Sequence, residues 1–178
     1  MKKVLIVVDM QNDFVTGSLG TKEAVAIVDN VVNKINEFDG EIIVTYDTHF
    51  NNYMETREGK YLPVPHCIKD TEGWQLNDKV QKALDARERY TIIHKPTFGS
   101  TELVDIIREY WDDENNIEVT LIGLCTDICV VSNAMLLKAN YPEMNIVVDA
   151  SCCAGVTVES HNAALTTMKM CQINVIGE

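Results

Sequence analysis

Apolar residues along the chain gather in short runs that are rich in valine and isoleucine. Each run is apolar along most of its length and does not alternate with polar residues, which is typical of strands buried on both faces of a parallel sheet. The runs are Val4–Val8, Ile42–Tyr46, Tyr90–His94, Val119–Ile122, Ile146–Val148 and Ile173–Ile176.

Segments with helical spacing lie between most of these runs. Apolar residues in Ala24–Ile35 recur at i, i+3 and i+4, as expected for a helix with one buried face. Shorter or weaker patterns predict helices at Val80–Leu84, Leu103–Tyr110 (after Ser100 as N-cap), Val130–Asn140 and Val158–Met170. Strands alternating with helices predict an α/β fold with a parallel sheet covered on both faces.

One connection does not fit this alternation of strands and helices. The segment from His49 to Trp74 has no clear period and contains Gly59, Pro63 and Pro65. Loops this long inside a compact domain are usually functional or disordered. Since two of the four histidines lie in it, we expect function.

Composition narrows the class of protein. The 178 residues, 46% apolar and 24% charged, predict one globular domain spanning 1–178, with the loop at about 48–74 as an insertion. The first apolar run is too short for a signal peptide, because Asp9 follows at once, and no run reaches the length of a membrane span. We therefore expect a cytoplasmic protein with reduced cysteines.

The charge balance is acidic. With 27 acidic and 15 basic residues, the formal net charge is −12. Nucleic acids and anionic membranes require a basic surface, so neither is an expected partner. A small neutral substrate remains compatible with this charge.

Polar residues with reactive side chains follow the first strands. Asp9 follows the first run, Asp47 and His49 the second, Lys95 the third, and the fourth leads to Cys129. Ligands of open α/β sheets bind beyond the carboxyl ends of the strands. Each residue alone has an ordinary explanation as a loop, cap or surface residue, but their coincidence predicts a site.

Cys129 lies at a strand-to-helix turn, with Thr126 or Asp127 as the expected N-cap. A helix start favours the thiolate and offers N–H groups to an oxyanion. With Asp9 as acid/base and Lys95 as cation, Cys129 could act as a nucleophile without a histidine. A cysteine that merely packs remains the alternative.

A second cluster consists of Asp47, His49, Glu58 and His66. Asp47 and His49 are two apart on an extended segment and point the same way. Two imidazoles and two carboxylates suit zinc, manganese or ferrous iron. The spacing fits no compact zinc motif, so the residues alone leave a metal site open.

Three motifs resemble the isochorismatase-like cysteine hydrolases, and within them the nicotinamidase branch. They are the opening segment Asp9–Phe14, the lysine Lys95 and the nucleophile segment Thr126–Val130. The resemblance implies a three-layer α/β/α sandwich with a six-stranded, Rossmann-like parallel sheet in the order 3-2-1-4-5-6. It also implies hydrolysis of nicotinamide to nicotinate and ammonia in NAD salvage.

The resemblance assigns the catalytic roles. Cys129 attacks the amide carbonyl, Asp9 carries protons, and Lys95 holds both in register. A cis peptide bond is expected at Leu124–Cys125, and the backbone N–H groups of Cys125 and Cys129 are expected to form the oxyanion hole.

The nicotinamidase branch further implies one divalent ion per subunit, with zinc expected first and manganese or iron open. Asp47, His49 and His66 match its ligands, and Glu58 lies where some members have a glutamate. The ion binds the pyridine nitrogen of the substrate.

Substrate contacts are also implied by the branch, whose members are commonly homo-oligomers. Phe14 matches an aromatic residue that packs on the ring. The segment before His66 is one residue longer than expected, so either Tyr61 or Leu62 forms the next wall.

Two alternatives remain. A metal-independent amidohydrolase of the same superfamily could act on another small amide or a ureido acid. A receiver or ligand-binding α/β domain would not be an enzyme, but receivers carry adjacent acidic residues after the first strand, whereas Met10 and Gln11 follow Asp9.

Overall fold

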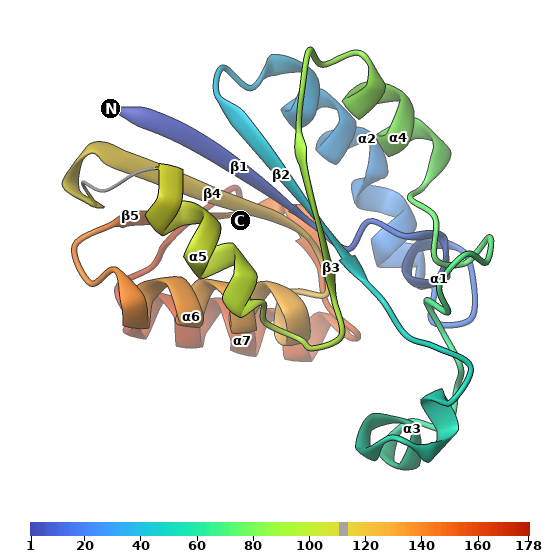
Figure 1. The fold of residues 1–178 in the computed structure, drawn as a ribbon. Coiled ribbons are helices and arrows are strands. Elements are labelled where there is room, and N and C mark those ends of the chain that lie inside the picture. Colours follow the sequence, from blue (N-terminus) through green and yellow to red (C-terminus); the bar gives the residue numbers. More distant parts are fainter. Residues whose placement is uncertain (111–113) are drawn as a thin grey trace.

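The computed structural model describes residues 1–110 and 114–178 and has a six-stranded parallel sheet between two layers of helices (Figure 1). The strand order is β3-β2-β1-β4-β5-β6, which confirms the predicted fold class. The strands are β1 (Lys2–Val8), β2 (Glu41–Asp47), β3 (Thr91–Lys95), β4 (Ile117–Leu124), β5 (Asn145–Ala154) and β6 (Asn174–Ile176).

Two helices cover one face of the sheet and three cover the other. Figure 1 shows α2 and α4 on one side and α5, α6 and α7 on the opposite side, with α1 and α3 beyond the carboxyl ends of the strands. The helices are α1 (Asn12–Val15), α2 (Lys22–Glu37), α3 (Arg57–Tyr61), α4 (Asp78–Asp85), α5 (Thr101–Tyr110), α6 (Val131–Asn140) and α7 (Val158–Met170). Shorter turns are the 3₁₀ turns Tyr53–Glu55 and Glu114–Asn116 and the π-helical turn Thr126–Val130.

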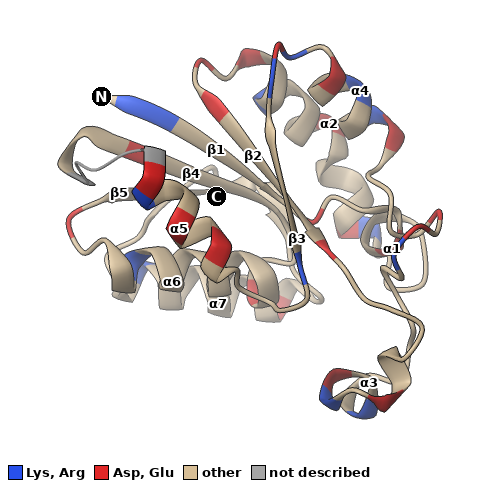
Figure 2. Ribbon diagram, in the orientation of Figure 1, with Lys and Arg blue, Asp and Glu red and all other residues tan. Residues whose placement is uncertain are grey.

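The sheet separates two apolar cores. Leu5 and Val7 of β1 pack with Val31 of α2 on one side, and Ile6 packs with Leu165 of α7 on the other. This follows from the strand period of two, which turns neighbouring side chains to opposite faces. Burying a side chain of this size contributes about 1.5–3 kcal/mol, so both faces stabilise β1. Charged residues lie mainly on the outer surfaces of the helices and in the connections (Figure 2).

Polar side chains cap the helices at several predicted positions. Thr21 accepts a hydrogen bond from the N–H of Ala24 at 3.0 Å, at the start of α2. Ser100 accepts one from the N–H of Leu103 at 3.3 Å, as predicted for α5. None of the helices within the described ranges combines the length and apolar composition needed to cross a membrane.

The strand order reverses at β1, which pairs with both β2 and β4. Val8, the last residue of β1, is opposite Thr45 on one side and Gly123 on the other. Gly123 has φ +111°, and a Cβ there would collide with the carbonyl of Val8. Only glycine therefore allows β4 to approach β1 this closely, and the residues after both strands meet at the switch point.

Candidate active site

The carboxyl ends of the strands bring Asp9, Lys95 and Cys129 together. The Nζ of Lys95 lies 2.6 Å from Oδ2 of Asp9 and 3.4 Å from Sγ of Cys129. The exposed fractions are 0% for Asp9, 1% for Lys95 and 5% for Cys129. The carboxyl group of Asp9 faces the thiol of Cys129 closely enough to raise its pKa. A thiol, a carboxyl group and an ammonium group thus share one buried cluster.

Asp9 is fixed by the neighbouring strand. Its backbone has φ +48°, a left-handed conformation that aspartate tolerates better than most residues. Its N–H donates to the carbonyl of Thr45 at 3.1 Å, and the hydroxyl of Thr45 donates to Oδ1 of Asp9 at 2.6 Å. The sequence analysis did not identify Thr45, although a hydroxyl within the apolar run of β2 was a signal for it.

Cys129 lies in the π-helical turn Thr126–Val130. The N-cap of this turn is Cys125, one residue before the first of the two predicted positions, because the carbonyl of Cys125 accepts the N–H groups of Ile128 at 3.1 Å and Val130 at 3.0 Å. The peptide bond Leu124–Cys125 is cis, as expected. Buried Asn133 donates to the carbonyl of Cys129 at 2.8 Å and accepts from the N–H of Ser100 at 2.9 Å, which joins the turn to α5.

The prediction of Thr126 or Asp127 as N-cap was wrong, because both side chains bind other partners. The hydroxyl of Thr126 lies 2.8 Å from Nδ1 of His161 on α7. The carboxylate of Asp127 accepts the N–H of Val156 with both oxygens at 3.1 Å. These contacts fasten the β5–α7 connection to the turn.

Burial controls the protonation of the cluster. It raises the pKa of Asp9, against the opposing effect of the Lys95 charge. Burial also raises the pKa of Cys129 well above its usual value, and the facing Asp9 carboxylate adds to this. For Lys95 burial acts to lower the pKa, but the charges of Asp9 and Cys129 outweigh it and the pKa is raised.

Burial and the facing Asp9 side chain both raise the pKa of Cys129, so they act against the thiolate that the helix start is expected to favour. A thiol with a raised pKa needs a neighbouring proton acceptor before it can attack, and Asp9, whose own pKa burial raises, is the adjacent carboxyl group.

Next to this cluster, Asp47, His49, Glu58 and His66 bring one ligand atom each to a common point, with all four atoms within 4.8 Å of one another. The Oδ2 of Asp47 lies 3.1 Å from Nε2 of His49 and 3.4 Å from Nε2 of His66. The Oε1 of Glu58 lies 3.6 and 3.7 Å from the same two nitrogens. Lys95 links the clusters, since its Nζ lies 3.9 Å from Oδ1 of Asp47.

This group fits a divalent metal ion. Neighbouring ligand atoms of zinc sites lie about 3–3.6 Å apart, given metal–ligand distances of about 2.0–2.2 Å. The Nδ1 of His66 lies 2.8 Å from the carbonyl of Val64 and so carries the proton, which leaves Nε2 free to coordinate. The Nε2 of His49 is buried and faces two carboxylate oxygens, Oδ2 of Asp47 at 3.1 Å and Oε1 of Glu58 at 3.6 Å, as expected for a nitrogen that shares an ion with them.

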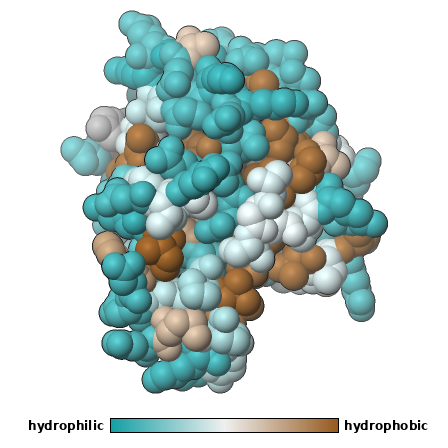
Figure 3. Space-filling model, turned by 90° about the vertical axis from the view of Figure 1, so that its right-hand side faces the viewer, coloured by the Kyte–Doolittle hydropathy of each residue, from teal (hydrophilic) through white to brown (hydrophobic). Residues whose placement is uncertain are grey.

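A cavity of about 310 Å³ joins the two clusters. Cys129 lines it on one side, and Glu58 and His66 line it on another. Phe14 and Leu62 contribute to its apolar wall, whereas Tyr61 is 79% exposed and lies outside it. Of the two alternatives for this wall, the structure thus places Leu62 at the cavity. Figure 3 shows hydrophobic surface between hydrophilic areas on the side of the molecule that lies to the right in Figure 1.

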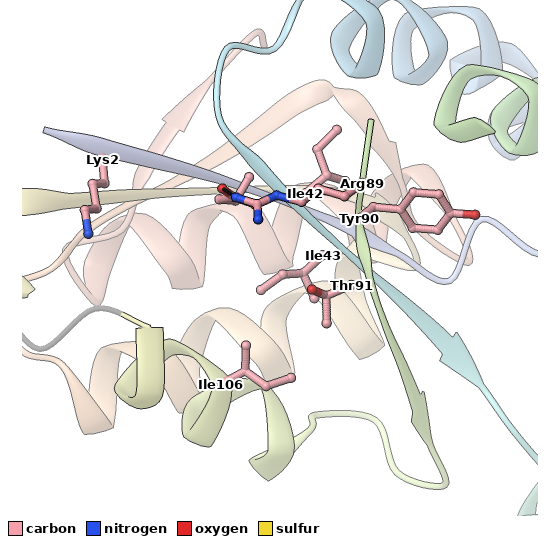
Figure 4. A pocket seen from close by; sticks show the side chains of 8 residues that line it. Lys2, Ile42, Ile43, Arg89, Tyr90, Thr91 and Ile106 are labelled. Atoms are coloured by element: carbon pink, nitrogen blue, oxygen red, sulfur yellow. Dashed lines mark hydrogen bonds and ion pairs between the residues drawn. The ribbon is translucent and has the colours of Figure 1, made fainter. Parts of the chain in front are cut away.

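A second hollow lies at the opposite ends of the strands (Figure 4). Lys2, Ile42, Arg89 and Ile106 are among the eight residues that line it. None of its lining residues is a cysteine or a histidine. The reactive side chains therefore converge on the carboxyl ends of the strands and not on this hollow.

Comparison with known proteins agrees with this geometry. The family model for the isochorismatase domain matches residues 3–177. The chain is 32% identical to a Bacillus subtilis protein named uncharacterized isochorismatase family protein PncA, over 93% of each chain.

Solved structures resemble the whole fold. The nicotinamidase/pyrazinamidase PncA from Bacillus subtilis superposes with a TM-score of 0.83 and 27% identity, covering 98% of this chain and 99% of that one. The pyrazinamidase of Pyrococcus horikoshii, solved in complex with zinc, gives a TM-score of 0.82 and 27% identity over 100% of both chains. With the family model spanning nearly its whole length, the chain belongs to the isochorismatase family and is an amidohydrolase.

Proposed function

We propose that this amidohydrolase converts nicotinamide to nicotinate and ammonia, with Cys129 as nucleophile, Asp9 as proton carrier and Lys95 as the cation that pairs with both. The observation that carries the proposal is the single cavity lined by Cys129 and by the metal-ligand residues Glu58 and His66. Such a cavity can hold a ring at one end and a carboxamide at the other.

The reaction begins with the thiol of Cys129, which gives its proton to Asp9 as its sulfur bonds to the amide carbon. The N–H groups of Cys125 and Cys129 are proposed to stabilise the oxyanion. Asp9 then passes the proton to the amide nitrogen, the C–N bond breaks, and ammonia leaves a thioester. Lys95 stays protonated throughout, since its neighbours raise its pKa.

A water molecule completes the cycle. Asp9 takes one proton from it as the oxygen attacks the thioester carbon. The C–S bond then breaks, and the sulfur recovers the proton through Asp9, which restores the resting thiol. The product retains the second proton of the water as a carboxylic acid and releases it to solvent, so it leaves as nicotinate. The same group therefore acts as base and acid in both halves of the reaction.

Asp47, His49, Glu58 and His66 are the proposed ligands of one divalent ion, with zinc as the first candidate. When bound, the ion supplies a Lewis acid for the pyridine nitrogen. Phe14 and Leu62 are proposed to enclose the ring. We further propose that residues 1–178 act as one domain, in the cytoplasm, in NAD salvage and as a homo-oligomer.

The test is incubation of the metal-loaded protein with nicotinamide, followed by measurement of ammonia and nicotinate. Pyrazinamide and a ureido acid serve as comparison substrates, and Cys129→Ala as the inactive control. Release of ammonia from nicotinamide that stops in chelator supports the proposal. Hydrolysis of the ureido acid alone, unchanged in chelator, would favour the metal-independent alternative.

A further inference from the structure

Gln11 and Asp13 lie two and four residues after Asp9, but the proposed chemistry uses neither side chain. Gln11 is fully buried. Its Nε2 donates to the carbonyl of Asp47 at 2.8 Å, and its Oε1 accepts the N–H of the same residue at 2.8 Å. One amide thus binds both backbone polar groups of Asp47, which fixes the direction of that carboxylate.

Asp13 acts on the other end of the ligand set. Its Oδ2 accepts the N–H of Cys67 at 2.8 Å, one residue after His66. Cys67 has φ +46°, a conformation that cysteine adopts only where its surroundings hold it. Phe14 adds a ring contact with His66, with centroids 5.4 Å apart. The position of His66 is therefore supported twice, through the backbone of the next residue and through contact of its ring with Phe14.

The end of the long connection is bound to the same segment. Gln11 forms an antiparallel bridge with Leu76, and its Nε2 also donates to the carbonyl of Trp74 at 2.8 Å. At Gly73 a Cβ would collide with the carboxylate of Asp13. The polar side chains of Gln11 and Asp13 thus hold both the strand end before the connection and the turn that carries its last ligand.

We propose that Gln11 and Asp13 are positioning residues for the divalent metal ion, one acting through Asp47 and the other through Cys67 on His66. This rests on the metal site of the proposed function. Outer contacts of this kind preorganise ligands and lower the conformational cost of binding. The opening segment would then serve both clusters, since Asp9 belongs to the first and its neighbours position the second.

The test is zinc affinity, measured on the metal-free full-length protein by competition with a chromophoric chelator. Gln11→Met and Asp13→Ala are expected to raise the dissociation constant about tenfold to a hundredfold. Asp13→Asn keeps an oxygen that can accept the N–H of Cys67 and should recover most of the affinity. Asn12→Ala is the matched control, because the side chain of Asn12 is only half-buried and donates to the carbonyl of Glu72, which is not among the ligands.

The absorption spectrum of the cobalt(II)-loaded protein gives a second readout, since it reports ligand geometry rather than folding. It should change in Gln11→Met and Asp13→Ala and stay as in the wild type in Asn12→Ala. Thermal unfolding of the metal-free proteins shows whether each variant is folded. If Asp13→Ala does not fold, Gln11→Met still tests the inference, because methionine has nearly the volume of glutamine.

Wild-type affinity and spectrum in both Gln11→Met and Asp13→Ala would overturn the inference. So would an equal loss in Asn12→Ala, because that indicates general loosening of the segment. If the wild type binds zinc no better than His66→Ala, the proposed metal site itself fails, which is a different outcome from failure of the positioning role.

Discussion

The two halves of the site lie side by side but differ in what supports them. Asp9 and Cys129 follow β1 and β4, and Lys95 is the last residue of β3, so the sheet places all three. Glu58 and His66 instead lie on a connection whose regular structure is a 3₁₀ turn and the five-residue helix α3. The first cluster is thus positioned by the fold, whereas the second depends on individual side-chain contacts. Changes in the first should abolish chemistry without loss of metal. Changes in the second should lose the metal and slow turnover, but leave the reactivity of Cys129 unchanged.

Replacement of the nucleophile should give the largest effect. Cys129→Ala removes the sulfur proposed to form the thioester and should lower ammonia release by a factor on the order of 10⁴ or more. Zinc content, measured by elemental analysis, should stay at the wild-type level. Cys171→Ala, which removes a thiol at the end of α7, is the matched control and should retain activity. Sustained turnover by Cys129→Ala would remove the proposed nucleophile.

The proton carrier should give the next largest effect. Asp9→Asn keeps the shape of the side chain but cannot accept the proton of Cys129, so kcat should fall on the order of 10²–10⁴-fold. Zinc content should again be unchanged, because Asp9 is not in the ligand set. A variant that retains most of its activity would show that another group moves the proton.

Replacement of a proposed metal ligand should affect the metal cluster and leave the cysteine cluster intact. His66→Ala should lose the ion and lower activity on the order of 10²-fold, since the ring is no longer oriented. The rate at which iodoacetamide alkylates Cys129, followed by peptide mass spectrometry, should stay unchanged. His94→Ala, which removes an exposed imidazole, is the control. Full metal content in His66→Ala would exclude this residue as a ligand.

The smallest effect is expected on the pH profile. Burial raises the pKa of Asp9 above the ordinary value of 3.8, so kcat/KM should fall as the pH drops through a value above 3.8. The hydroxyl of Thr45 stabilises the carboxylate and lowers this pKa. Thr45→Val should therefore shift the acid limb to higher pH while the plateau is kept. A shift to lower pH, or none, would mean that the limb reports another group.

The sequence predicted that Asp9, Lys95 and Cys129 lie together, because the signals for the strands that carry them are local. Apolar runs such as Val4–Val8 mark buried strands, and topology then brings their ends together whatever the distance along the chain. The start of the nucleophile helix was misplaced because Thr126 and Asp127 bind α7 and the β5–α7 connection, which no local pattern reveals.

For the metal cluster, whose Glu58 and His66 lie on the long connection, the sequence predicted which side chains take part but not how they are held in place. The contacts that fold it join positions far apart in sequence, such as Gln11 with Asp47 and Asp13 with Cys67. The helix α3 is too short for its apolar period to be detected, and its Thr56 cap is the kind of signal that many loops also carry. The choice between Tyr61 and Leu62 depended on this local geometry.

The most direct test of convergence on one cavity is a crystal structure of the zinc-loaded protein with nicotinate. The carboxylate is expected beside the sulfur of Cys129, and the ring nitrogen on an ion held by Asp47, His49, Glu58 and His66. Nicotinate bound elsewhere, or bound with its ring turned away from that ion, would contradict the account.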